Sequence, residues 1–182
     1  MNKYLKRTKN KTLKYCYTVT TFIINKRGID FKERNKFMKN KYCNKLGLVV
    51  DNNFIPIDIK IFKGNINDSN ALQQQIEYIK KYMENIKYFI CDKGYCSSIT
   101  RNIFKNNEIV PIIPFNNRNT IDKTKIKKLT EAEKNKYRRR IKIEHIFRNL
   151  KILNKLGTRY EKYIKNYEEL IYLYFIKKIY SI

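Results

Sequence analysis

Residues 137–151 read YRRRIKIEHIFRNLK, and the interpretation of the fold starts from this stretch. Thr130 and Glu133 precede it as a Thr-x-x-Glu pair, which is typical of a helix start. At about 100° per residue, four polar side chains of mixed charge share one stripe of the expected helix, within about 60° of one another. These four are Tyr137, Arg140, Glu144 and Lys151.

An apolar face lies beside this stripe. It consists of Ile143, Ile146, Phe147, Leu150 and Leu153. The carboxylate of Glu144 is therefore expected at the edge of a packed interface, with a cation on either side along the helix. Such a carboxylate suits a metal or phosphate site. The alternative is an ordinary charged amphipathic helix in which the four residues coincide by chance, because lysine is common in this chain.

The spacing Tyr-x2-Arg-x3-Glu-x6-Lys resembles the signature around the last acidic residue of DDE-type insertion-sequence transposases. The resemblance implies a ribonuclease-H-like fold in which Glu144 is the third metal-binding carboxylate. It also implies that Arg140 and Lys151 contact DNA phosphates and that Tyr137 supports the site. The neighbouring cations Arg138, Arg139 and Arg148 are expected to bind DNA as well.

Asp92-Lys93-Gly94-Tyr95 resembles the motif around the second metal-binding aspartate of the same family. Taken alone, Asp-Lys-Gly is more often a turn or a helix cap. Asp92 nevertheless follows an expected strand, where open α/β sheets commonly place a ligand site. Further matches bring the resemblance to about Thr18 to Ile176. They are Gly64-Asn65 with Asp68-Ser69, the strand Lys45 to Asp51, and Gly157-Thr158-Arg159-Tyr160.

Hydrophobic patterning predicts an α/β fold with a mixed five-stranded sheet flanked by helices and a C-terminal helical extension. The expected strands are 14–25, 44–51, 54–62, 87–91 and 109–113; the expected helices are 70–84, a short one ending near 106, one starting at Thr130 and one at 167–180. Gly28 to Lys41 is expected to be a charged connection. Residues 1–13 are expected to form a basic arm and residues 14–182 one domain, while Phe115 to Leu129 is expected to be a basic loop near DNA.

The first strand lacks the acid that the family requires. The family's chemistry uses two divalent metal ions held by three carboxylates, for which Mg²⁺ or Mn²⁺ is suited. Alignment through Thr21-Phe22 places Val19 at the position of the first aspartate, and valine offers no metal ligand. Asp51 and Asp58 are expected to lie away from the gap between the first and fourth strands. Asp92 and Glu144 are therefore the metal ligands that remain.

The chain is strongly basic, with 41 Lys and Arg against 16 Asp and Glu, a formal net charge of +25. Lys, Asn, Ile and Tyr dominate, as in proteins from A/T-rich genomes. Codon bias alone does not explain the charge, because Asp and Glu codons are also fairly A/T-rich. The excess therefore favours a polyanionic partner such as DNA, bound in a salt-dependent manner.

The composition also limits location and assembly. The four cysteines, Cys16, Cys43, Cys91 and Cys96, have no zinc-ligand spacing and are expected to be reduced thiols. Neither a signal peptide nor a membrane span is expected, which predicts an intracellular, DNA-associated protein in the cytoplasm, nucleoid or nucleus. The last helix is apolar nearly all round, so it must pack against the domain or against a second copy in a homodimer.

Three functions are compatible with these observations. The first is a DDE transposase that cuts and joins DNA with some unconventional third ligand. The second is a DNA-binding protein that keeps the fold after its catalytic site has decayed. The third is a remnant of a mobile element without a present role. Members of the group usually carry helical sequence before the first strand, so sequence-specific recognition of a transposon end is not expected from this chain alone.

Overall fold

The computed structural model describes residues 14–80, 86–115 and 128–180. The predicted basic arm over 1–13, the end of the predicted helix 70–84 and most of the predicted DNA-contacting loop lie outside the described residues.

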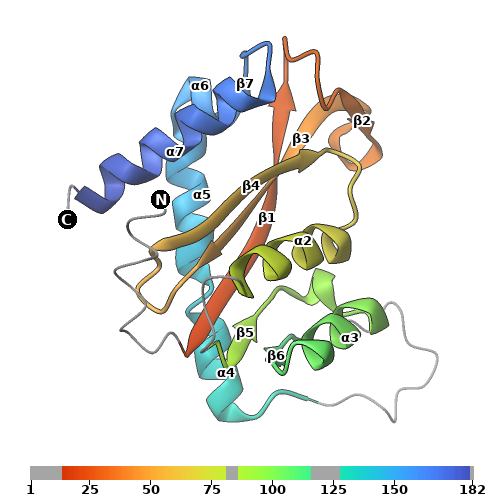
Figure 1. The fold of residues 1–182 in the computed structure, drawn as a ribbon, viewed down its shortest axis with the longest axis vertical. Coiled ribbons are helices and arrows are strands. Elements are labelled where there is room, and N and C mark those ends of the chain that lie inside the picture. The colour runs from red at the N-terminus through yellow and green to blue at the C-terminus, as the bar shows by residue number, and fades with distance from the viewer. Residues whose placement is uncertain (1–13, 81–85, 116–127, 181–182) are drawn as a thin grey trace.

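The sheet has the predicted five strands in the order β4-β3-β1-β5-β6 (Figure 1). Their bounds are β1 Tyr15–Asn25, β3 Lys41–Val50, β4 Pro56–Lys63, β5 Tyr88–Ile90 and β6 Val110–Ile112. β3 pairs antiparallel with both β1 and β4, whereas β1, β5 and β6 run parallel. This mixed sheet is the predicted ribonuclease-H-like arrangement.

Two short strands were not predicted. β2 (Glu33–Asn35) and the 3₁₀ turn η1 (Lys36–Met38) lie within the stretch that the sequence predicted to be a charged connection. β2 pairs with the start of β3, on the edge that β4 occupies further along. β7 (Thr158–Arg159) pairs in parallel with the last residues of β1. Both strands are too short to show a period of two, so pairing partners and not local sequence define them.

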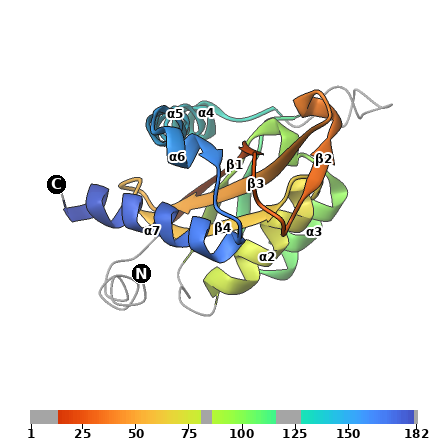
Figure 2. The same cartoon turned by 90° about the horizontal axis from the view of Figure 1, so that it is seen from above.

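Helices cover both faces of β1, as Figure 2 shows. On one face, α2 (Asp68–Lys80) and α3 (Ser98–Asn106) pack with Cys16 and Phe89 into one apolar core. On the other, α5 (Ile141–Ile152) packs with Tyr17, Val19 and Ile23 into a second core. Side chains of β1 alternate between the two cores, which confirms the prediction of a central strand covered on both sides.

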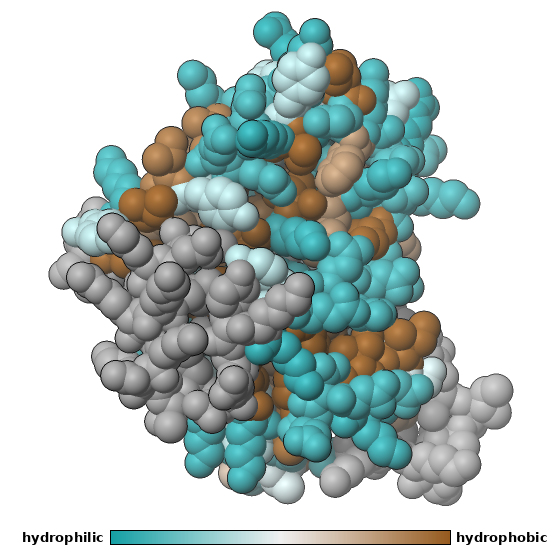
Figure 3. Space-filling model, in the orientation of Figure 1, coloured by the Kyte–Doolittle hydropathy of each residue, from teal (hydrophilic) through white to brown (hydrophobic). Residues whose placement is uncertain are grey.

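The last helix, α7 (Ile164–Tyr180), packs against β4 through Tyr167, Ile171 and Phe175. The domain itself therefore covers one face of this apolar helix. Three large side chains on α7 stay exposed, namely Leu173, Ile176 and Tyr180. Figure 3 shows apolar side chains gathered in the region of α7 on a mostly hydrophilic face. None of the helices in the described ranges combines the length and the apolarity that crossing a bilayer requires.

The expected single helix from Thr130 is divided in two, which corrects the prediction. α4 (Glu131–Arg138) begins with the predicted capping box between Thr130 and Glu133, and α5 begins at Ile141. Between them, Arg140 N bonds Tyr137 O at 2.9 Å and Ile143 N bonds Arg140 O at 2.9 Å. These bonds span three residues, so the backbone tightens at the joint while its dihedral angles stay helical. The short helix α6 (Asn154–Gly157) follows α5, and the predicted apolar residue Leu153 lies outside α5 and is exposed.

Gly157 allows α6 to approach the end of α5. A Cβ atom there would lie 2.4 Å from the carbonyl oxygen of Lys151. We therefore expect Gly157→Ala to lower the free energy of unfolding by about 2 kcal/mol in urea titrations, since the backbone must shift. Gly94→Ala is the matched control, because no atom lies within 4 Å of the added methyl group. Equal losses of stability in the two variants would contradict this expectation.

Candidate active site

A pocket of about 600 Å³ opens beside β1 where β5 has ended. β5 pairs with β1 only at Tyr15–Tyr17, and β7 pairs with it only at Ile24 and Asn25. Between these two points no strand of the described chain pairs with this edge of β1. The pocket is lined by Val19, Thr20, Thr21, Asp92, Arg140, Glu144, Phe147, Arg148, Lys151 and Ile152.

The structure thus brings together Val19, Asp92 and Glu144, which the sequence placed at the positions of the family's three acids. It also places three of the predicted DNA-binding cations in the pocket wall, namely Arg140, Arg148 and Lys151. Tyr137 does not line the pocket but donates a hydrogen bond from its hydroxyl to Asp92 Oδ1 at 3.1 Å.

Arg138 and Arg139 do not line the pocket. Arg138 donates to Asn135 Oδ1 at 3.0 Å on its own helix. Arg139 donates to Asn52 O at 3.1 Å and lies over the ring of Phe54, so it joins the α4–α5 joint to the turn between β3 and β4. Consecutive side chains on a helix point about 100° apart, so Arg138 and Arg139 do not share the side on which Arg140 lines the pocket.

Asp92 lies two residues after the end of β5 and caps the short turn η2 (Lys93–Tyr95). Its Oδ1 atom accepts from the amide of Lys93 at 2.7 Å and from Tyr137, and lies 3.8 Å from Arg140 Nη2. Within the described part of the chain, no hydrogen bond to Oδ2 is found. Burial, followed by the charge of Asp92, raises the pKa of Tyr137, so the phenol stays a hydrogen-bond donor at neutral pH.

Arg140 connects the two acids of the pocket. Its Nη2 atom lies 2.8 Å from Glu144 Oε1 and 3.8 Å from Asp92 Oδ1. The arginine side chain is only 13% exposed, and its Nε atom is buried without a hydrogen-bond partner. A guanidinium group therefore occupies the space between the carboxylates and neutralises part of their charge.

Lys151 connects the last turn of α5 to β1. Its Nζ atom donates to Thr21 Oγ1 at 2.6 Å. Burial lowers the pKa of Lys151, because removal of water disfavours the ammonium form. With Arg148 and Arg140, it makes three cations against two carboxylates in the pocket lining. The pocket is therefore better suited to an anion such as a phosphate group than to further positive charge.

The residues present do not fit a two-metal centre. Val19 is 7% exposed and packs with Ile143 and Phe147 of α5, so it adds an apolar side chain and no metal ligand to the pocket wall. Among the described residues, no group of three or more Asp, Glu, His or Cys side chains is placed to hold a metal ion. Asp51 accepts from amides in the turn after β3, and Asp58 accepts from Gln75, and neither lines the pocket.

Asp68 is a neighbour of the pocket that the sequence did not single out as a site residue. Its Oδ1 atom accepts from Thr20 Oγ1 at 3.0 Å and pairs with Lys45 Nζ at 2.9 Å. The Lys45 side chain is 7% exposed and also donates to Ile66 O at 2.6 Å. Two signals in the sequence point to this pair, namely the lysine that precedes the apolar end of β3 and the family match that includes Asp68 and Ser69. Asp68 is a carboxylate bound to the pocket wall, although it does not line the pocket.

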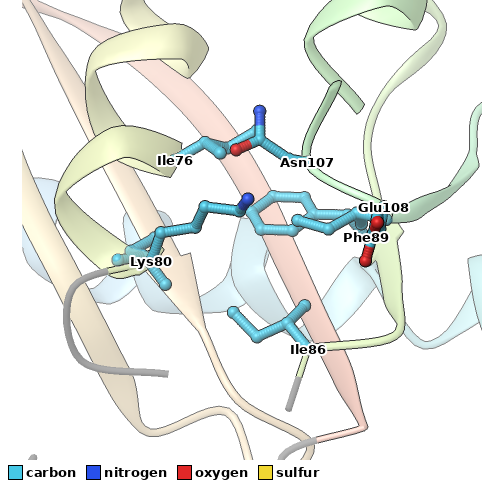
Figure 4. Close-up of a pocket in the computed structure, with 8 residues that line it drawn as sticks. Ile76, Lys80, Ile86, Phe89, Asn107 and Glu108 are labelled. Atoms are coloured by element: carbon cyan, nitrogen blue, oxygen red, sulfur yellow. The ribbon is translucent and has the colours of Figure 1, made fainter. Parts of the chain in front are cut away.

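A second hollow of about 310 Å³ lies on the other face of the sheet (Figure 4). Five of its eight lining residues are apolar, among them Ile76 of α2 and Phe89 of β5. Figure 4 shows Lys80 reaching from α2 toward Phe89. None of the predicted site residues lines this hollow, and it contains no pair of carboxylates.

Comparison with solved structures gives integrase and transposase proteins at low identity. The HTLV-2 integrase catalytic core domain in complex with magnesium has a TM-score of 0.44 and 11% identity, covering 80% of this chain and 74% of that one. The Mos1 transposase paired-end complex with left transposon end has a TM-score of 0.39 and 14% identity, covering 60% of this chain. The match spans 38% of that Mos1 chain. The Mos1 strand transfer complex has a TM-score of 0.40 and 13% identity, and the match covers 88% of this chain and 60% of that chain.

No curated protein matches the chain at a significant level. A family model does match, over residues 12–176, and it is described as the transposase DDE domain. This range includes every residue of the pocket as well as Tyr137 and Asp68. The chain therefore belongs to the family of transposase DDE domains.

Proposed function

We propose that the chain is a transposase-family protein that binds DNA at the pocket and whose DNA cleavage and strand transfer are impaired by Val19. The observation that carries the proposal is the position of Val19 in the pocket wall beside Asp92 and Glu144. Family membership supports the substrate class, and the missing carboxylate supports the impairment.

In this proposal, the two remaining acids are Asp92 and Glu144, the residues that would hold Mg²⁺ or Mn²⁺ in an active relative. Here Arg140 partly neutralises both. Arg148 and Lys151 face the same pocket and would contact phosphates, with Tyr137 fixing the orientation of Asp92. Arg138 and Arg139 would contact DNA only outside the pocket, beside the α4–α5 joint.

DNA affinity is expected to be insensitive to metal and sensitive to salt. We expect labelled duplex DNA to bind equally in EDTA and in Mg²⁺, as measured by fluorescence anisotropy. The double variant Arg148→Ala/Lys151→Ala should reduce the slope of log affinity against log salt by about two, since two phosphate contacts are lost. Arg101→Ala/Lys105→Ala on α3 is the matched control, because it removes one arginine and one lysine outside the pocket lining.

Plasmid nicking separates this proposal from an active enzyme with an unconventional ligand. We expect the unaltered protein to leave supercoiled plasmid intact at all Mg²⁺ and Mn²⁺ concentrations. Metal-dependent nicking that Asp92→Asn abolishes would overturn the proposed impairment. Loss of that nicking in Asp68→Asn as well would identify Asp68 as the substitute acid, since it is bound to Thr20 in the pocket wall.

A further inference from the structure

The hairpin between β2 and β3 carries an aromatic side chain that no part of the described domain covers. Phe37 lies in the 3₁₀ turn at the hairpin tip and is 90% exposed, the largest exposed fraction among the large apolar residues in the described ranges. Leaving a phenylalanine in water forgoes the favourable free energy of burying a large apolar side chain. A single exposed apolar residue is common, so the surroundings of Phe37 decide whether it has a function.

The backbone holds Phe37 outward in a fixed turn. The buried side chain of Asn35 accepts from the Phe37 amide at 2.8 Å and donates to Gly64 O at 2.7 Å. The turn closes with Lys39 and Asn40 in the left-handed region, at φ 53° and 55°. Because Asn35 is anchored to the end of β4, the tip is joined to the body of the sheet and does not depend on Phe37 for its shape.

Several cations lie close to Phe37 along the chain, and two of them, Lys32 and Arg34, lie over the ring of Tyr42. Five positively charged residues lie on or beside this hairpin, and all are exposed: Lys32, Arg34, Lys36, Lys39 and Lys41. Glu33, the one acid in the same stretch of sequence, is close to Lys63 and accepts from Asn65. An apolar ring within excess positive charge matches a partner that offers both a flat apolar surface and negative charge. An unpaired nucleotide offers both, through its base and its phosphate.

The hairpin tip also lies within reach of DNA bound at the pocket. Thr21 of the pocket is opposite Leu46 of β3, and Lys41, the first residue of β3, lies five residues before Leu46. At about 3.3 Å per residue this is roughly 17 Å, or about five nucleotides of a DNA strand. In Figure 1, β2 and its turn lie at the end of the sheet opposite β5 and β6.

We infer that the β2–β3 hairpin is a second nucleic-acid contact in which Phe37 stacks on an unpaired base while the surrounding lysines bind phosphates. This contact is independent of the catalytic state of the pocket. It gives the chain a preference for single-stranded or unpaired DNA that charge alone does not provide.

The sequence contains no tryptophan, so Phe37→Trp places a single fluorescent reporter at the tip. We expect oligothymidylate to quench the F37W emission by half or more, because a stacked base quenches indole. Heparin, which has charge but no bases, should leave the emission unchanged. Tyr180→Trp, at an 82% exposed position on α7, is the matched control and should not respond to either polymer.

Affinity measurements complete the test. Phe37→Ala and Phe37→Leu should both weaken oligothymidylate binding by about tenfold, since neither side chain stacks. Both should unfold at the same urea concentration as the parent protein. If anisotropy shows that oligothymidylate binds but the emission of F37W is not quenched, the hairpin contact is wrong, while the proposed function at the pocket stands. If the protein binds no DNA at all, both the hairpin contact and the proposed function are wrong. If Phe37→Leu binds oligothymidylate as tightly as the parent protein, the contact is apolar but not stacked, which contradicts the inference.

Discussion

Replacing Val19 with aspartate should give the pocket a measurable affinity for Mn²⁺ and Mg²⁺ that the parent protein lacks. The new carboxylate would lie beside Asp92 and Glu144 in the same pocket. Three oxygen donors suit these ions, whereas two carboxylates already paired with Arg140 compete poorly for them. We expect the same substitution to produce metal-dependent nicking of supercoiled plasmid.

Thermal unfolding gives a readout that does not require activity. In EDTA, Val19→Asp should be less stable than the parent by about 2 kcal/mol, because the side chain it replaces is 7% exposed. Mn²⁺ at about 100 times its dissociation constant should then raise the melting temperature of this variant by roughly 5 to 10 °C. Val19→Asn is the matched control, with the same size and polarity but no charge. Equal responses of the two variants to Mn²⁺ would show that Val19 is not the missing ligand position.

The second large effect is expected at Arg159, which is fully buried. Its guanidinium donates to Asp30, Asn44, Glu161 and Lys162, and thereby joins β7 to the loop after β1, to β3 and to the start of α7. Arg159→Met should lower the free energy of unfolding by about 4 kcal/mol, because five acceptor atoms, two of them on Asp30, lose their donor.

Urea titration measures this loss, and a surface pair provides the control. Lys134→Met removes the exposed ion pair with Glu131 on α4 and should leave the free energy of unfolding nearly unchanged, because solvent screens this pair. Arg159→Lys should fall between the two, since an ammonium group keeps the charge but cannot reach all five acceptors. A loss at Arg159→Met no larger than that at Lys134→Met would contradict the proposed role of the buried arginine.

The same cluster predicts a dependence on pH. Burial alone would raise the pKa of Asp30, but the amide of Ile164 and the guanidinium of Arg159 together lower it below its ordinary value. A carboxylate with a lowered pKa in the folded state stabilises the protein above its unfolded pKa of about 3.9. This stabilisation is lost as pH falls through the lower, folded pKa. Asp30→Asn should therefore weaken the dependence of stability on pH in this acidic range.

Local sequence was sufficient for the five main strands and for most of the pocket. A run of β-branched and aromatic residues identifies β1, and the spacing of Arg140, Glu144 and Lys151 places them on one side of α5. The break at Arg139 and Arg140 could not be predicted, because both residues keep helical dihedral angles and only their hydrogen-bond partners change.

The partners of the charged residues also could not be predicted from local sequence. The ion pair of Lys45 with Asp68 joins residues 23 positions apart, and that of Arg140 with Asp92 joins residues 48 positions apart. Both depend on how strands and helices meet, which periodicity does not encode. β2 and β7 were missed for the same reason, since their few residues become strands only by pairing with β3 and β1.

Polar contacts hold both ends of the helix that carries Glu144 against the sheet region. Arg140 pairs with Asp92 after β5, and Lys151 donates a hydrogen bond to Thr21 of β1. The polar residues that define the transposase signature therefore also support the architecture of the domain. A copy that has lost the reaction would still be selected to keep them for as long as folding matters. The presence of this signature in a genome is thus evidence of ancestry and of a folded domain, whereas the first strand must be inspected before mobility is inferred.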